Sequence, residues 1–150
     1  MSRLAAVIVA FALALVLVAC DAEAPPASPG GAHPPTLAGT SWAVVAVDGQ
    51  RPPIGSRPTM AFDAVKVTGS GGCNGFGGAY RYEPASGTLA FDGLGMTLVG
   101  CENVIGTYES RLFGALRAVS TAVLRQDGSL VLSGPGGQIV LAAAGQTVVN

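Results

Sequence analysis

The chain has 150 residues and carries eight Lys or Arg against nine Asp or Glu, which gives a formal net charge of −1. This balance offers no basic surface for neutralising phosphates, so we do not expect the protein to bind nucleic acid. The charged fraction is 11% and the apolar fraction is 49%, a composition that favours one ordinary domain with an apolar core.

The N-terminus is typical of a bacterial export signal. Arg3 supplies a positive start, residues 4–18 are apolar and uncharged, and Ala19 precedes Cys20. As a helix the apolar stretch would span about 22 Å, which is short of the ~30 Å hydrocarbon core of a membrane. The sequence Leu17-Val18-Ala19-Cys20 resembles the lipobox cut by lipoprotein signal peptidase.

We therefore expect residues 1–19 to be a lipoprotein signal peptide and Cys20 to carry the lipid that anchors the protein to a membrane. The domain would then lie outside the cytoplasm, in the bacterial cell envelope. A plain secretory signal, which would leave Cys20 as a free thiol, is the alternative. We interpret residues 20–36, which are rich in Pro, Ala and Gly, as a tether, and the only histidine, His33, falls within it.

From Leu37 onward, short β-branched and aromatic runs alternate with turn signals such as Asp48-Gly49 and Asp127-Gly128. The pattern predicts a mainly β (α+β) fold, a compact antiparallel β-barrel-like domain of about eight short strands with one packed amphipathic helix. The runs that we interpret as strands are 41–47, 59–62, 64–68, 79–83, 88–91, 96–99, 122–125, 129–132 and 138–141.

One segment has helical periodicity. Apolar residues recur at helical spacing, whereas Glu102, Glu109 and Arg117 fall away from that stripe. We predict a helix over residues 103–119, packed against the sheet, within a domain that covers residues 37–145. Residues 146–150 are expected to be a frayed tail. The apolar residues of the stripe are Val104, Ile105, Tyr108, Leu112, Leu116 and Val119.

Two cysteines, Cys73 and Cys101, lie inside the domain. In an oxidising compartment such a pair tends to form a disulfide, with a metal pair or a reactive thiol as alternatives. Zinc would need two further Cys or His ligands, and the one histidine lies in the tether. We therefore expect a disulfide and no metal site.

Nothing in the domain matches a catalytic pattern. Histidine-based catalysis needs a histidine on the scaffold, and the glycine run 72–78 lacks the Gly-Lys-Ser/Thr of a phosphate loop. We expect no catalytic residues and no cofactor, and we interpret Asn74-Gly75 as a tight turn. The carboxylates are scattered, at Asp63, Glu83, Asp92, Glu102, Glu109 and Asp127.

Three segments together carry a family resemblance. They are Leu37-Ala38-Gly39-Thr40-Ser41-Trp42, Gly72-Cys73-Asn74-Gly75-Phe76-Gly77-Gly78-Ala79-Tyr80 and Met96-Thr97-Leu98-Val99-Gly100-Cys101. Downstream of them come Glu109, Phe113 and Leu116, and then Leu130-Val131-Leu132. Their order resembles the META domain family, which includes HslJ-like heat-shock proteins of bacterial envelopes. The resemblance implies a barrel-like β domain with one helix, a general association with stress and envelope integrity, and no established reaction. The residues that match the family motif, and that form a possible contact loop, are Gly72, Asn74, Gly75, Phe76, Gly78, Tyr80 and Thr97.

These observations lead to one functional hypothesis and two alternatives. The hypothesis is a monomeric, non-catalytic envelope lipoprotein that acts in stress tolerance through contacts with an envelope protein partner. One alternative is an inhibitor of an envelope hydrolase that inserts the loop 73–80, with Phe76 either buried in the domain or exposed for contact. The other is a barrel that binds a small ligand. We favour burial of Phe76, because large apolar side chains are rarely exposed without a function.

Overall fold

The computed structural model describes residues 31–145. The predicted signal peptide 1–19, the predicted lipidation site Cys20 and the predicted tail 146–150 lie outside the described residues. Within residues 31–145, no helix is long and apolar enough to cross a membrane.

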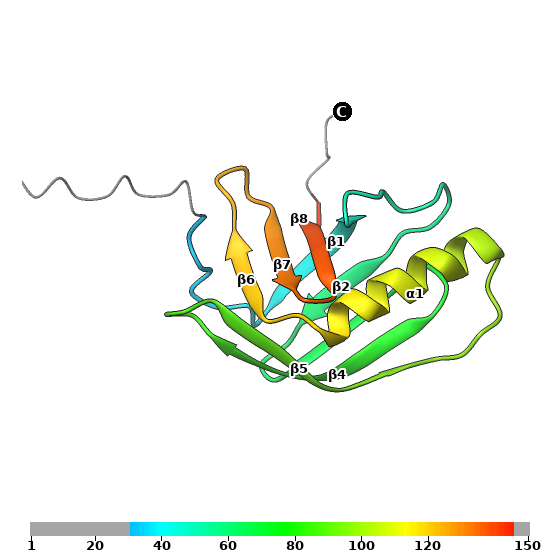
Figure 1. The fold of residues 1–150 in the computed structure, drawn as a ribbon. Helices are drawn as coiled ribbons and strands as arrows, with labels where there is room; N and C mark the ends of the chain where they lie inside the picture. Colours follow the sequence, from blue (N-terminus) through cyan, green and yellow to red (C-terminus); the bar gives the residue numbers. More distant parts are fainter. Residues whose placement is uncertain (1–30, 146–150) are drawn as a thin grey trace, which may run out of the picture.

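Eight antiparallel strands form a closed barrel in which each strand pairs with its neighbours in the chain and β8 pairs with β1 (Figure 1). This confirms the predicted fold class. Alternating β-branched and small residues form the strands, and most of the turns between them are short enough for direct hairpin pairing. The strands are β1 Thr40–Val47, β2 Thr59–Phe62, β3 Lys66–Ser70, β4 Gly75–Glu83, β5 Thr88–Met96, β6 Thr121–Leu124, β7 Leu130–Gly134 and β8 Gly137–Ala143.

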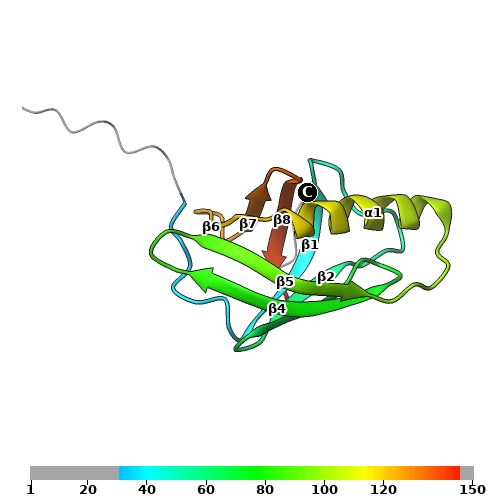
Figure 2. The same ribbon diagram turned by 60° about the horizontal axis from the view of Figure 1, so that its bottom comes forward.

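The single helix of the described residues, α1 (Asn103–Arg117), connects β5 to β6. Because β5 pairs with β6 only at Thr88↔Thr121, most of its outer edge has no strand partner on that side. The helix lies alongside the β4–β5 hairpin (Figures 1 and 2) and also packs against β8 and β1. Its buried side chains include Leu112, Phe113 and Leu116. The helix therefore covers the place where the barrel is weakest in strand pairing.

Apolar side chains fill the interior of the barrel. The three large cavities found around the described residues open at the surface. The structure therefore gives no support to the alternative in which a small ligand occupies the barrel interior. The buried residues of the strands include Val44, Val47, Leu89, Leu130, Leu132, Ile139 and Leu141.

Two strand predictions are wrong at the β4–β5 hairpin. The glycine run, expected to be a turn, enters strand β4 at Gly75, and the strands predicted at 88–91 and 96–99 are one strand that ends at Met96. A register shift between Gly77 and Ala79 lies opposite Gly93, which has a φ of 60°. This bulge allows the pairing between β4 and β5 to continue through the glycines as far as Phe76 and Met96. Residues 97–99 then leave the sheet.

The last residues of the predicted tether lie against the barrel. Ala32 forms an isolated β-bridge with Leu124, and the Tyr82 hydroxyl donates a hydrogen bond to the Pro34 carbonyl at 2.7 Å. The chain thus reaches β1 along the side of β6, with His33 exposed.

Candidate functional site

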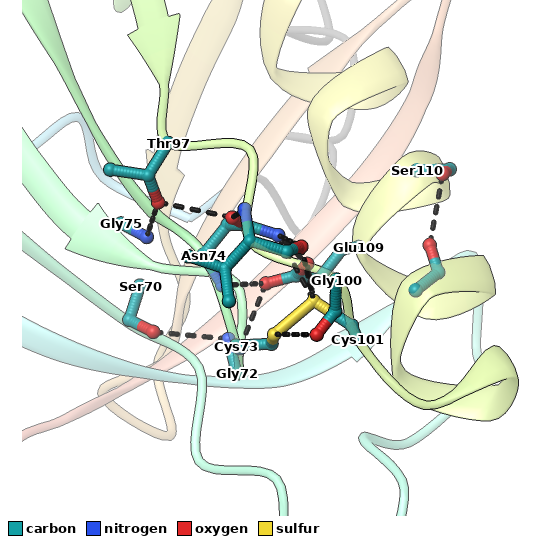
Figure 3. The surroundings of a disulfide bond; sticks show 12 residues. Ser70, Gly72, Cys73, Asn74, Gly75, Thr97, Gly100, Cys101, Glu109 and Ser110 are labelled. Carbon is teal, nitrogen blue, oxygen red and sulfur yellow. Dashed lines mark hydrogen bonds between the residues drawn. A yellow bond between two sulfur atoms is a disulfide. The ribbon is translucent and has the colours of Figure 1, made fainter.

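Four of the family-motif residues, Gly72, Asn74, Gly75 and Thr97, lie where the β3–β4 turn, the β5–α1 connection and helix α1 come together (Figure 3). The turn is closed by the Gly71 N–H, which donates to the Asn74 carbonyl at 2.8 Å. The residue with left-handed backbone is Gly72, at a φ of 117°, and not Asn74 or Gly75 as the sequence suggests. A side chain at Gly72 would also collide with the Ser56 hydroxyl. Only glycine suits this position.

The predicted disulfide between Cys73 and Cys101 is confirmed, with a Cα–Cα distance of 6.1 Å. Closing a loop of this length contributes about 3–4 kcal/mol in the chain-entropy model. The two sulfur atoms and a carboxylate oxygen of Glu109 lie within 4.8 Å of one another. Because the sulfurs are bonded to each other, they offer no thiolate to a metal in this oxidised state.

Glu109 is the buried acceptor at the centre of this site. Its side chain is 3% exposed. Oε1 accepts hydrogen bonds from the backbone N–H groups of Cys73 (2.9 Å) and Asn74 (2.6 Å). Oε2 accepts one from the Asn74 side-chain amide at 2.8 Å. Gly71 makes room for it, because a Cβ there would lie 2.6 Å from Oε1.

Asn74 links the turn to the β5–α1 connection through side-chain hydrogen bonds. Its Oδ1 accepts from the Val99 N–H (2.7 Å) and from the Thr97 hydroxyl (3.0 Å), and its Nδ2 also donates to the Val99 carbonyl (3.3 Å). Thr97 in turn exchanges hydrogen bonds with the Gly75 backbone, at 3.1 and 2.9 Å. Both ends of the Asn74 amide are thus fully used.

The other motif residues, Phe76, Gly78 and Tyr80, lie in strand β4 and contribute to the packing and pairing of the barrel. Phe76 is buried and packs edge-on against Phe113, with 5.7 Å between ring centroids, so burial is the correct one of the two readings. Tyr80 donates from its hydroxyl to the Asp63 carbonyl at 2.8 Å. Gly78 lies at the bulge, where a Cβ would come within 2.8 Å of the Asp92 carbonyl oxygen.

The helical periodicity wrongly places Glu109 on the polar face of the helix, and the family resemblance includes Glu109 without giving it a role. The signal is present in its spacing, because Glu109 follows Ile105 by four residues and precedes Phe113 by four. These are positions that share one face of a helix. Val104, which the periodicity places in the apolar stripe, is instead exposed.

Sequence reasoning also misses two exposed apolar side chains on the β5–α1 connection. Leu98 is 90% exposed and Val99 is 61% exposed, although both are expected from the sequence to lie in a strand. They are open to solvent while their backbone is fixed by Asn74 and by the neighbouring disulfide.

Replacing Glu109 by Gln should destabilise the fold although the two side chains have almost the same shape. In one orientation of the Gln amide its NH₂ group would face the backbone N–H groups of Cys73 and Asn74, and in the other it would face the Asn74 side-chain amide. In both cases a buried donor would lose its acceptor, at a cost of about 1–3 kcal/mol. Urea unfolding measures this loss. The neighbouring Ser110→Ala is the control, with an expected change within about 0.5 kcal/mol. A Glu109→Gln variant as stable as the unchanged protein would contradict this description of the site.

Comparison with known proteins adds a family and a fold. The model of the META domain matches residues 35–146, and no curated protein matches the chain. A solution structure of a protein from Burkholderia xenovorans is 23% identical, covers 73% of this chain and 85% of its own, and has a TM-score of 0.58. A second solution structure is 20% identical, covers 72% and 92%, and has a TM-score of 0.60.

A crystal structure of a DUF4847 family protein from Bacteroides vulgatus is 17% identical over 75% of this chain and 97% of its own, with a TM-score of 0.53. At these identities the solved structures show a shared fold and nothing more about function. The family match is of a different kind, because it spans the whole barrel together with the turn, the connection and the helix that form the site. The chain belongs to the META domain family.

Proposed function

We propose that this protein is a non-catalytic, lipid-anchored protein of the bacterial envelope that binds another envelope protein through the β5–α1 connection. The observation that carries the proposal is the pair of exposed apolar side chains, Leu98 and Val99, held on a backbone that is fixed from two sides. Residues with this combination of exposure and rigidity are suited to recognition.

The proposed location rests on the N-terminal sequence and on the disulfide. Residues 1–19 have the pattern of a lipoprotein signal, which ends before Cys20. The Cys73–Cys101 disulfide is compatible with an oxidising compartment outside the cytoplasm. Acylation of Cys20 with two or more chains would give a stable anchor, which a single chain would not.

The proposed absence of catalysis rests on how the motif residues are used. Asn74, Thr97 and Glu109 direct their polar atoms at one another and at nearby backbone groups. A general acid or base must instead reach a substrate proton with its polar atom. We therefore assign these residues the structural role of holding the β5–α1 connection, with its exposed side chains, in one conformation.

That surface includes a groove that could receive a side chain of the partner. A cavity of about 360 Å³ lies between the β5–α1 connection and the helix. Met96, Leu98 and Phe113 contribute apolar atoms to it, and Arg117 lies among its lining residues. A buried apolar anchor beside a charged residue is a common arrangement in protein interfaces.

A role in envelope stress tolerance follows from the family resemblance and belongs to this proposal. Inhibition of an envelope hydrolase is one form that the contact could take. In that case the inserting residues would be Leu98 and Val99, because Phe76 on the loop 73–80 is buried.

The lipid anchor is tested by labelling cells of the source organism with a palmitate analogue. We expect the protein to incorporate the label and the Cys20→Ser variant to lose it, because Cys20 is the proposed acceptor. The Cys73→Ser, Cys101→Ser double variant should keep the label. A mature protein that begins at Cys20 with an unmodified thiol would contradict the anchor.

The binding surface is tested by placing a photo-crosslinking amino acid at position 98 of the full-length protein in living cells. We expect a discrete crosslinked partner there and none from position 65. Val65 is the matched control because it is also exposed, at 62%, but lies before β3, on another part of the barrel.

The same partner should then lose affinity for a Leu98→Ser, Val99→Ser double variant. Its melting temperature should stay close to that of the unchanged protein, because exposed side chains contribute little to stability. Crosslinks of equal yield from positions 65 and 98, or unchanged affinity in the double variant, would contradict the proposed surface.

A further inference from the structure

The outer edge of strand β5 is open beyond its first residues. β5 pairs with β4 from Thr88 to Met96, but with β6 only at Thr88↔Thr121. Within residues 31–145, no other strand lies on this side of β5. The helix lies alongside the β4–β5 hairpin (Figures 1 and 2) and yet leaves Gly95 exposed. An open strand edge offers unpaired backbone groups to a further strand.

The pairing with β4 determines which backbone groups face outward at the end of β5. Phe76 and Met96 are opposite each other, and the next residue, Thr97, donates its N–H to the Gly75 carbonyl at 2.9 Å. Opposite residues in an antiparallel pair are alternately hydrogen-bonded and not hydrogen-bonded to each other. The N–H and C=O groups of Met96 therefore point away from β4, toward the side on which β5 has no strand partner.

A groove runs beside this edge, with helix α1 as its other wall. The cavity of about 360 Å³ described above is continued along β5 by a small pocket that Leu94 and Gly95 help to line, and Met96 lines both. A groove between a strand edge and a helix suits an extended peptide, because the peptide backbone pairs with the strand while alternate side chains enter the groove. The helix residues of the wall lie on one face of the helix and are Gly106, Ser110, Phe113 and Arg117.

The charge of the groove indicates what such a peptide would carry. Arg117 is exposed, and within residues 31–145 no carboxylate forms an ion pair with it. The one acidic residue of the lining, Glu109, is buried and accepts hydrogen bonds from Cys73 and Asn74. A carboxylate on the peptide would therefore meet the Arg117 guanidinium, whereas a basic peptide would meet positive charge.

We propose that the partner protein binds this groove with an extended segment, which pairs with the outer edge of β5 at Met96 as an additional strand and places a carboxylate side chain against Arg117. This proposal rests on the proposed function, in which the partner contacts Leu98 and Val99, and it adds the conformation and the charge of the segment that the partner contributes. A folded surface that only packs on those two side chains would fulfil the proposed function without this pairing.

The test uses a phage-displayed library of random peptides, selected against the full-length protein in detergent micelles. We expect the enriched peptides to contain Asp or Glu among apolar residues. Synthetic versions, each with one N-methylated peptide bond, are then titrated and followed by fluorescence. Because only every second N–H of an added strand bonds to β5, N-methylation at alternate positions should weaken binding at least about tenfold and should have little effect at the positions between.

Two matched pairs of variants locate the binding. Ser110→Trp should weaken the peptides at least about tenfold, because the indole would occupy the groove that Ser110 lines. Thr107→Trp is its control, since Thr107 is also exposed on the helix but lies outside this groove. Arg117→Gln should weaken the acidic peptides about tenfold, since it removes a charged hydrogen bond. Arg57→Gln, at an exposed arginine outside the groove, should leave their affinity unchanged. Melting temperatures show whether each variant is folded.

The proposal would be overturned if no peptide were enriched, if N-methylation had no alternating effect, or if the two members of either variant pair had equal effects. Pairing of this edge with a second copy of the chain would also overturn it. That pairing would be seen in sedimentation as a dimer that Ser110→Trp dissociates.

These results are distinguishable from those of the crosslinking experiment in cells. A partner that crosslinks at position 98 but keeps its affinity for the Ser110→Trp variant would support the proposed function and contradict strand addition. Peptides that bind as expected, without any crosslinked partner in cells, would support the groove and contradict the proposed function.

Discussion

The arrangement of the site depends on the buried carboxylate of Glu109, which accepts hydrogen bonds from three N–H groups. Two of those donors are backbone groups of the β3–β4 turn, and the third is the Asn74 amide. A buried N–H without an acceptor is costly, so the turn is stable only when the helix places this carboxylate against it. The helix that covers the weakly paired side of β5 is thus fixed to the barrel by a polar contact in addition to its apolar face.

Asn74 and the disulfide extend this constraint to the β5–α1 connection. Asn74 bonds to both backbone groups of Val99, while the disulfide joins Cys73 of the turn to Cys101 of the connection. The β3–β4 turn is therefore tied both to the connection and to the helix, which follow each other in the chain and are distant from the turn in the sequence (Figure 3). The presence of Asn74 and Thr97 in the family motif has its physical explanation in this network. The proposed binding surface consists of the exposed apolar side chains that the network holds.

The barrel is predictable from the sequence because strand alternation and turn residues are local signals. The helix is predictable for the same reason, and the disulfide is predictable from a pair of cysteines in a chain that we expect to be exported. The geometry of the site is harder to predict from the sequence. Glu109 reads as a surface residue because charge usually indicates exposure, although its spacing places it on the buried face.

The turn and the connection are misassigned from the sequence for a related reason. Asn74-Gly75 is a common turn sequence, but the Asn74 side chain is occupied by Glu109, Thr97 and Val99, and Gly72 takes the left-handed position instead. Leu98 and Val99 have the composition of a strand, yet the same hydrogen bonds draw their backbone out of the sheet. In each case a long-range polar contact overrides a local preference, and a single sequence does not show such contacts.

A double-mutant cycle between Asn74 and Glu109 tests most directly whether these two side chains hold the site together as one unit. Asn74→Ala, Glu109→Ala and the double variant would be unfolded in urea with the disulfide intact. If the two residues act together, the double variant should lose less stability than the sum of the single losses, with a coupling of about 1–3 kcal/mol. Losses that add to within about 0.5 kcal/mol would mean that the two side chains contribute independently, and would contradict the central role of the Glu109–Asn74 contact.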